Sequence, residues 1–133
     1  MPNHELASAS LDYTIIVWNV QQAQIKFRLN GHTDHVWSMA LLSHGLLASG
    51  SSDSFIIVWD YRNGEEKIKL KGHQGNVNTL CWTRECYLVS GASDHKVVVW
   101  DFNNESLRQA VGISKTTNVN GNDAKVENDW KIV

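Results

Sequence analysis

Two sets of a histidine, a serine and an aspartate stand at the same spacing in this sequence. The first set is His32, Ser49 and Asp53, and the second is His73, Ser90 and Asp94. These residue types make up the triad of many hydrolases, in which the serine attacks a carbonyl carbon. Such a serine must be exposed beside groups that stabilise an oxyanion. Ser49 and Ser90 instead lie among small residues in strand-like segments, and the set occurs twice. We therefore favour a structural role and expect no catalytic residue.

Metal and redox chemistry find little support in the sequence. His32 and His35 are close together, but a third metal ligand is not evident. Cys81 and Cys86 are the only cysteines, whereas a structural zinc site needs about four ligands. Two cysteines also make no disulfide framework. We expect reduced thiols, no metal site and no cofactor.

The histidine, serine and aspartate residues belong to an internal repeat with a period of 41 residues. The columns that recur at this period are Trp18, Trp59 and Trp100; Asp12, Asp53 and Asp94; Ser8, Ser49 and Ser90; and Gly31-His32 with Gly72-His73. No insertion or deletion breaks the register from Leu6 to Val111. A period of about 20–50 residues indicates a solenoid, a propeller or a repeat array.

Each unit reads as short β-strands separated by polar turns. The apolar runs at 15–18, 55–59 and 97–100 are β-branched and end in tryptophan, which predicts buried strands. A strand is expected before each of them, at 6–10, 46–51 and 87–92, and a further strand at 36–41 and 77–82. Weak alternation predicts an outer, half-exposed strand in each unit, carried by Ile25, Phe27 and Leu29; by Ile68 and Leu70; and by Leu107 and Val111.

Gly-His, a Ser-x-x-x-Asp turn and an apolar strand ending in Trp-Asp together resemble the WD-repeat β-propeller family. Trp59-Asp60 and Trp100-Asp101 match the motif, and Trp18-Asn19 is a mild variant. The resemblance implies an all-β, partial propeller of roughly three four-stranded blades, which one chain of this length is not expected to close. The blades would span 5–111, as an incomplete blade one (5–30), blade two (31–71) and blade three (72–111). We expect 112–133 to be a polar, flexible tail.

The resemblance also implies a buried hydrogen-bond network in two blades. Its members would be His32, Ser49, Asp53 and Trp59 in blade two, and His73, Ser90, Asp94 and Trp100 in blade three. The aspartate would accept from the imidazole, whose other nitrogen meets the serine hydroxyl, which in turn meets the indole N–H. Burial of these groups is tolerable because each has a partner.

Blade one lacks both its inner strand and its Gly-His, because residues 1–4 align with the turn before the second strand. A closed propeller has about four to eight blades. Three explanations stay open: a fragment or truncated form of a longer propeller, two copies that complete a ring as a homo-oligomer, or an open arc. Residues 129–133 have strand character and could supply a strand in cis or to another copy.

The resemblance implies a non-catalytic scaffold for protein–protein interaction. By motif position, the partner-binding candidates are Leu11, His35, Trp37, Ser52, Asn76, Asn78 and Ser93. Trp37 is the sharpest candidate, because exposed aromatic side chains are frequent hot spots. The alternatives are that Trp37 only packs against the neighbouring blade and that Asn76 and Asn78 stabilise their loops.

A more specific reading comes from Trp59-Asp60-Tyr61-Arg62, which looks like the box of WD-repeat substrate receptors of cullin-type ubiquitin ligases. Arg62 would then contact the ligase adaptor as a forked donor; the alternative is a solvated residue on a surface loop. Lys plus Arg is 12 and Asp plus Glu is 14, so a net charge of −2 does not favour nucleic acid. No run approaches the roughly 18 apolar residues of a membrane span. We expect other proteins as partners, no nucleic acid, no membrane, and a cytoplasmic location with the nucleus as the alternative.

Overall fold

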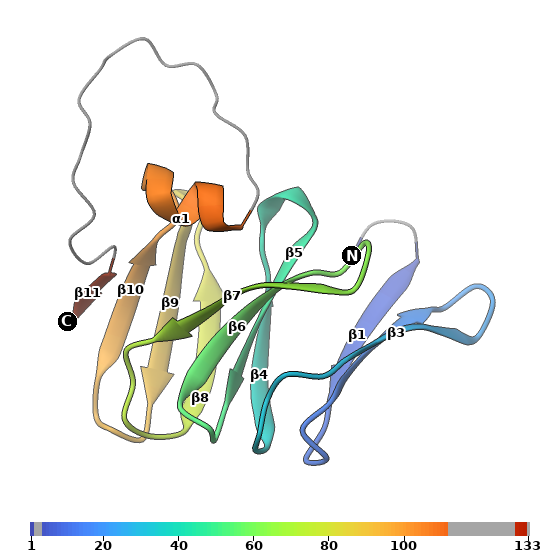
Figure 1. Ribbon diagram of the computed structural model, residues 1–133, viewed down its shortest axis with the longest axis horizontal. Helices are drawn as coiled ribbons and strands as arrows, with labels where there is room; N and C mark the ends of the chain where they lie inside the picture. Colours follow the sequence, from blue (N-terminus) through green and yellow to red (C-terminus); the bar gives the residue numbers. More distant parts are fainter. Residues whose placement is uncertain (2–3, 112–129, 133) are drawn as a thin grey trace, which may run out of the picture.

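Three antiparallel β-sheets make up the protein in the computed structural model, which describes residues 1, 4–111 and 130–132 (Figure 1). Sheet A contains β1 (Glu5–Ala9), β2 (Ile15–Asn19) and β3 (Gln24–Leu29). Sheet B contains β4 (Val36–Leu41), β5 (Leu46–Ser51), β6 (Phe55–Asp60) and β7 (Glu65–Lys71). Sheet C contains β8 (Val77–Trp82), β9 (Tyr87–Ala92), β10 (Val97–Asp101) and β11 (Trp130–Ile132). A 3₁₀ turn, η1 (Ser43–Gly45), precedes β5, and a short helix, α1 (Glu105–Ala110), follows β10.

The sheets stand side by side without closing into a ring (Figure 1). The expected all-β partial propeller is therefore confirmed. Sheet A has the strand order β1-β2-β3, so its β1 is an edge strand among the described residues. In sheets B and C the equivalent strands, β5 and β9, are paired on both sides. Within the described part of the chain, sheet A has no strand equivalent to β4 and β8.

The core consists of two separate layers, one on each face of sheet B. Successive side chains of a strand point to opposite faces of a sheet. In β6, Ile57 and Trp59 pack toward Ile15 and Val17 of sheet A. The alternate residues Ile56 and Val58 belong to the layer that contains Val77, Leu88 and Val98 of sheet C. Each fully buried aliphatic side chain contributes about 1.5–3 kcal/mol, so both layers hold neighbouring sheets together.

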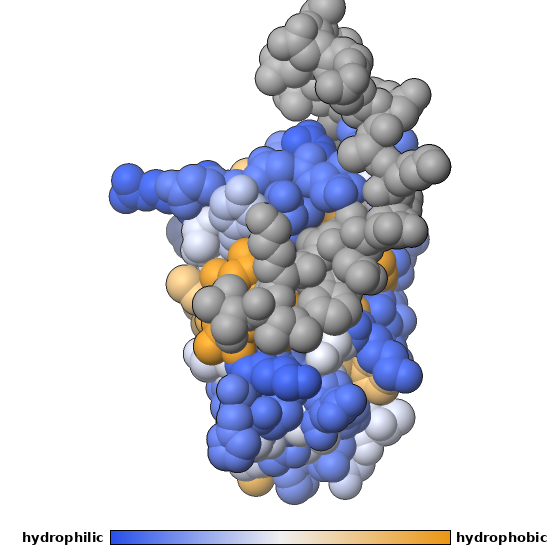
Figure 2. Space-filling view, turned by 90° about the vertical axis from the view of Figure 1, so that its left-hand side faces the viewer, coloured by the Kyte–Doolittle hydropathy of each residue, from blue (hydrophilic) through white to orange (hydrophobic). Residues whose placement is uncertain are grey.

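The two outermost sheet faces carry apolar side chains that are open to solvent. On sheet A, Leu6 pairs with Trp18, which pairs with Ile25, and Leu6 is 55% exposed. On sheet C, Val97 is exposed, and Val99 and Val89 are partners in the register of β10 and β9. Figure 2 shows hydrophobic residues on the side of the molecule formed by sheet C, with hydrophilic residues around them.

The segment after β10 corrects one prediction. Leu107 and Val111 were expected in an outer strand, but Leu107 lies in helix α1 and both side chains are buried in the layer between sheets B and C. A spacing of four residues places both side chains on one helix face. Asn104 caps the helix, since its side-chain oxygen accepts a hydrogen bond of 2.9 Å from the Ser106 N–H.

The fourth strand of sheet C is β11, which pairs antiparallel with β10 in the register Val99↔Lys131. The outer position of this sheet is therefore filled from within the chain, by residues with the strand character noted in the sequence. We predicted a flexible tail at 112–133. Residues 112–129 and 133 lie outside the described part of the chain.

The turns repeat their backbone conformation at the 41-residue period, whatever residue occupies them. Positive φ angles occur at three sets of equivalent positions: Tyr13, Ser54 and His95; His4, Gly45 and Cys86; and Ala23 and Gly64. Glycine adopts this region freely, whereas a side chain makes it strained. The geometry of the unit therefore imposes these angles on residues that do not favour them.

Candidate functional site

A buried relay of four side chains fastens sheet B. His32 lies in the loop before β4, Ser49 in β5, Asp53 in the turn after β5, and Trp59 in β6. The imidazole Nδ1 of His32 is 2.8 Å from an Asp53 carboxylate oxygen, and its Nε2 is 2.7 Å from the Ser49 hydroxyl. The Trp59 indole N–H donates to the same hydroxyl at 2.8 Å. The relay thus links the loop, the turn and two strands.

Sheet C repeats the relay with nearly the same distances. His73 Nδ1 is 2.9 Å from an Asp94 carboxylate oxygen, and His73 Nε2 is 2.8 Å from the Ser90 hydroxyl. The Trp100 indole N–H donates to this hydroxyl at 2.9 Å. The eight residues that the sequence assigned to two networks therefore meet in two separate groups of four.

The geometry fixes the direction of each hydrogen bond when the imidazole is neutral. Nδ1–H of His32 donates to Asp53, so Nε2 accepts from the Ser49 hydroxyl, whose oxygen accepts from Trp59. The Ser49 side chain is fully buried, as is that of Ser90. A substrate carbonyl cannot reach either hydroxyl, so the arrangement is suited to holding strands together and not to nucleophilic attack.

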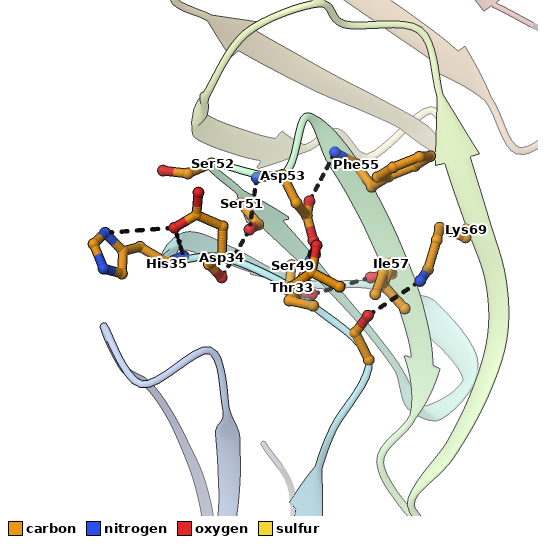
Figure 3. Close-up of polar contacts among 12 residues, drawn as sticks. Thr33, Asp34, His35, Ser49, Ser51, Ser52, Asp53, Phe55, Ile57 and Lys69 are labelled. Carbon is orange, nitrogen blue, oxygen red and sulfur yellow. Dashed lines mark hydrogen bonds and ion pairs between the residues drawn. The ribbon is translucent and has the colours of Figure 1, made fainter.

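Each relay aspartate also organises its turn. One oxygen of Asp53 accepts from the Phe55 N–H at 2.9 Å, and the other from the Thr33 N–H at 3.0 Å (Figure 3). Burial opposes ionisation of Asp53, but these backbone hydrogen bonds and the one from His32 prevail and lower the pKa of its carboxyl.

The same balance acts on Asp94. Burial again opposes ionisation, while hydrogen bonds from the Gln74 N–H, from His73 and from the Lys96 N–H lower the pKa of Asp94 to about 2. Both turn residues are therefore carboxylates at neutral pH, which is the form that accepts hydrogen bonds from the imidazole and the backbone.

Sheet A has only half of this arrangement. The Trp18 indole N–H donates to the Ser8 hydroxyl at 2.9 Å, as in the other sheets. Asp12 caps its turn by accepting from the Thr14 N–H at 3.0 Å. Among the described residues, no imidazole bonds to Ser8 or Asp12. Ser8 is accordingly half-buried, whereas Ser49 and Ser90 are fully buried.

A row of exposed aromatic rings lies at the loop end of sheets A and B. We define the aromatic row as Tyr13, His35 and Trp37. The Tyr13 and His35 ring centroids are 5.5 Å apart, and those of His35 and Trp37 are 5.8 Å apart in an edge-on arrangement. Trp37 is 50% exposed and Tyr13 43% exposed. These rings are held in place yet open to solvent, which is the condition for a contact surface.

Polar and apolar neighbours complete this surface. The Trp37 indole N–H donates to the Ser52 hydroxyl at 2.6 Å, which fixes the ring against the turn after β5. Leu11, in the turn before β2, is 57% exposed. The Asp34 side chain is about half exposed and lies beside His35 (Figure 3). Three predicted binding residues, His35, Trp37 and Ser52, are thus joined to Tyr13 by direct contacts, and Leu11 lies in the same turn as Tyr13.

The equivalent positions of sheet C do not continue the row. Asn76 stands where sheet B has His35, and Asn78 stands where sheet B has Trp37. The Asn76 N–H donates to the Ser93 hydroxyl at 2.8 Å, and the Ser93 N–H donates to the Asn76 carbonyl at 2.9 Å. Asn76 and Ser93 therefore join loop to turn, while the Asn78 side chain is exposed.

Arg62 lies in the turn after β6, which is at the other end of the strand from the aromatic row. Its guanidinium makes a two-pronged pair with Asp60, with Nε and a terminal nitrogen 2.9 and 2.6 Å from the two carboxylate oxygens. The Arg62 side chain is 61% exposed. Hydrogen bonds from Arg62 outweigh burial and lower the pKa of the Asp60 carboxyl. Asp60 is itself buried, so the pair presents only the Arg62 guanidinium to solvent.

Among the described residues, no group of three or more histidine, cysteine, aspartate or glutamate side chains lies close enough to hold a metal ion. No helix in the described part has the length and apolar character that crossing a membrane requires.

The repeated sheets, with buried relays in two of them, define this chain as a propeller-type repeat protein. Residues 23–60 and 64–101 match the family model of the WD domain, G-beta repeat (WD40), and together they make up more than half of the chain. The chain therefore belongs to the WD40 repeat family.

Solved structures agree with this assignment. The chain is 31% identical to the WD40 repeats of RRP9, with a TM-score of 0.66 over 72% of this chain and 30% of that one. It is also 31% identical to U3-55K, with a TM-score of 0.67 over 73% of this chain and 30% of that one. The chain thus spans about a third of the length of these relatives. No curated protein sequence matches it.

Tyr13 is the residue of this surface that the sequence reasoning missed. It occupies the turn after Asp12, where the equivalent residues are Ser54 and His95, so the repeat gave no reason to select an aromatic ring there. Its positive φ of 76° places it in a tight turn, and its side chain is 43% exposed there. An aromatic residue at such a tip is a candidate contact residue in its own right.

Proposed function

We propose that this chain is a non-catalytic scaffold that binds another protein through the aromatic row and its neighbours Leu11 and Ser52. WD40 repeat domains generally serve as protein-interaction scaffolds. The observation that supports the proposal most is the pair of half-exposed rings, Trp37 and Tyr13, joined through His35. Tryptophan and tyrosine bury a large area at little cost in side-chain entropy when they are already ordered.

The partner is a protein and not a nucleic acid in this proposal. Asp12 and Asp34 adjoin the aromatic row, and a phosphate backbone would meet these carboxylates unfavourably. We further propose that the chain acts as part of a longer or assembled propeller, in the cytoplasm or the nucleus. The open outer faces of sheets A and C, with Leu6 and Val97 exposed, support this part of the proposal.

Affinity capture with quantitative mass spectrometry tests the binding surface. Wild-type chain, Trp37→Ala and the matched control Val20→Ala are compared, since Val20 is 55% exposed and follows β2 at the far end from the row. We expect at least one protein to be retained by wild type and Val20→Ala and depleted about tenfold or more by Trp37→Ala, a loss of about 1.4 kcal/mol. An interactome that Trp37→Ala leaves unchanged would contradict the proposed surface.

The ligase-receptor alternative rests on the two-pronged pair of Arg62 and Asp60, which presents a guanidinium to solvent. Arg62→Lys keeps the charge but loses the fork, so it is the sharper substitution. If Arg62→Lys abolished capture of a cullin adaptor while Trp37→Ala did not, the ligase-receptor function would be favoured over binding through the aromatic row. Equal adaptor recovery from wild type and Arg62→Lys would remove it.

A further inference from the structure

The edge strand β1 of sheet A has the backbone register and the polar side chains that β5 and β9 use to hold a neighbouring inner strand. Sheets A and B share one register: Ser8 pairs with Ile16 as Ser49 pairs with Ile57, and Ala9 pairs with Ile15 as Gly50 pairs with Ile56. In sheet B the other side of β5 is covered by β4, with Met39 opposite Ser49. The same side of β1 has no partner among the described residues.

The polar groups beside this edge are already arranged to receive an imidazole. Ser8 holds the Trp18 indole N–H at 2.9 Å, which is the contact that Ser49 makes with Trp59. Hydrogen bonds from the Thr14 hydroxyl and backbone lower the pKa of Asp12, so it is a carboxylate at neutral pH. In sheets B and C, the matching serine and aspartate are bridged by His32 and His73.

The two complete sheets also show what must precede the histidine. A Cβ atom placed on Gly31 would lie 2.8 Å from the Trp59 ring, and one on Gly72 would lie 2.8 Å from the Trp100 ring. These glycines pass directly over the indole, where a side chain would collide. A segment that brings a histidine to Ser8 and Asp12 therefore needs glycine immediately before it, above Trp18.

The strand that follows the histidine has one further requirement. Sheet A carries Ala9 where sheets B and C carry Gly50 and Gly91. A Cβ on Gly50 would lie 2.6 Å from a Val77 methyl of sheet C and 2.9 Å from the Ser38 hydroxyl, and a Cβ on Gly91 would lie 2.9 Å from the Thr79 methyl. Since Ala9 has that Cβ, the residue facing it on an incoming strand fits best as glycine. Ser38 is the sixth residue after His32, so the glycine falls at the sixth position.

We propose that β1 is a docking edge for an extended segment of a partner polypeptide. This segment contains Gly-His, and a short apolar strand begins four residues after the histidine, as β4 begins four residues after His32. The strand adds to β1 by backbone hydrogen bonds, and its histidine bridges Ser8 and Asp12. The N–H after the histidine donates to Asp12, as Thr33 and Gln74 donate to Asp53 and Asp94. Docking would bury the Ser8 hydroxyl and give sheet A a fourth strand next to β1. The proposal does not depend on the aromatic row.

The test uses the full chain and a fluorescein-labelled peptide. The probe has the sequence of residues 30–41 with Ser38→Gly, because β4 shows how this segment sits in sheet B. We expect saturable one-to-one binding by fluorescence anisotropy. The same peptide with His32→Ala should bind about tenfold or more weakly, because Ser8 and Asp12 then lose their partner.

Substitutions in the chain give the reciprocal test. Ser8→Ala should weaken the histidine peptide and leave the alanine peptide unchanged, which a general loss of stability would not do. Asp12→Asn should weaken the histidine peptide more than the alanine peptide, because the alanine peptide keeps only the backbone N–H that donates to residue 12. Ser43→Ala, a serine substitution in η1 at the far end of sheet B, is the matched control and should bind as wild type. Equal affinity for the histidine and alanine peptides would overturn the proposal, as would failure of both to bind.

Discussion

Replacement of Ser49 by alanine separates a structural relay from an incidental contact. The Ser49 hydroxyl is fully buried and satisfies two groups at once, the Trp59 indole N–H at 2.8 Å and the His32 Nε2 at 2.7 Å. An unsatisfied buried polar group costs about 1–3 kcal/mol. With two groups left unsatisfied, Ser49→Ala should lower the free energy of unfolding by about 2–5 kcal/mol. That loss is a large part of the roughly 5–15 kcal/mol that stabilises a typical domain.

The same substitution at the equivalent position of sheet A is the internal control. Ser8 is half-buried and accepts only from Trp18, so water can replace it when it is removed. Ser8→Ala should therefore cost less than about 1 kcal/mol. Ser90→Ala should behave like Ser49→Ala, because Ser90 is fully buried and makes the same two contacts.

Urea denaturation followed by tryptophan fluorescence and by far-ultraviolet circular dichroism measures these differences. With a slope of about 2 kcal/mol per molar urea, Ser49→Ala should move the midpoint down by about 1–2.5 M, and Ser8→Ala by less than about 0.5 M. Coincident transitions from both probes are required before the free energies are compared. Equal midpoints for wild type and Ser49→Ala, or an equal shift for Ser8→Ala, would refute the reasoning.

Four further outcomes are expected. Ala23→Gly should raise the free energy of unfolding by up to about 1 kcal/mol in the same urea assay, because Ala23 has a φ of 50° where its repeat equivalent is Gly64; a lower midpoint would contradict this. The pKa of the Asp94 carboxyl is about 2 in the folded protein against 3.8 for the free side chain, so its contribution to stability is complete above about pH 5 and is lost as pH falls through about 4 toward 2. Wild type should therefore lose stability over that range, whereas Asp94→Asn, already weaker at pH 7, should lose less from pH 7 to pH 3; equal losses would contradict this. Trp37→Ala should cost less than about 1 kcal/mol, because the ring is half exposed, and a loss near 3 kcal/mol would assign Trp37 to packing. Light scattering after size exclusion should give a mass near twice 15.0 kDa if two copies cover each other's outer faces, and 15.0 kDa if they do not.

The strands of sheets B and C were predictable because their residues repeat three kinds of signal at one period. An apolar β-branched run, a turn aspartate and a terminal tryptophan each restrict the structure, and they agree in every unit. The relay could be assigned for the same reason, since Ser49 and Asp53 recur as Ser90 and Asp94. The alignment of residues 1–4 with the turn before the second strand predicted a first sheet without its inner strand, and β1 is an edge strand among the described residues.

The errors came where the period ends. After Asp101 the expected outer strand is replaced by α1, because Leu107 and Val111 are four apart and Asn104 caps a helix. Two apolar residues at that spacing fit a strand or a helix, and only the contact with the layer between sheets B and C decides between them. Likewise, Tyr13 joins His35 across a sheet boundary, and no pattern within one unit reveals such a pair.

The two core layers on opposite faces of sheet B have a consequence for folding cooperativity. Ile57 and Trp59 belong to one layer and Ile56 and Val58 to the other, so the layers share a sheet without sharing side chains. Stability in such an array is a sum of nearest-neighbour terms, and parts of it can open separately. Native-state hydrogen exchange should therefore be graded. In the described part of the chain, sheet A is held by a layer of eight buried residues, whereas the layer between sheets B and C has thirteen, so the amides of sheet A should exchange before those of sheets B and C. Sheet B would be the last to open, because it takes part in both layers.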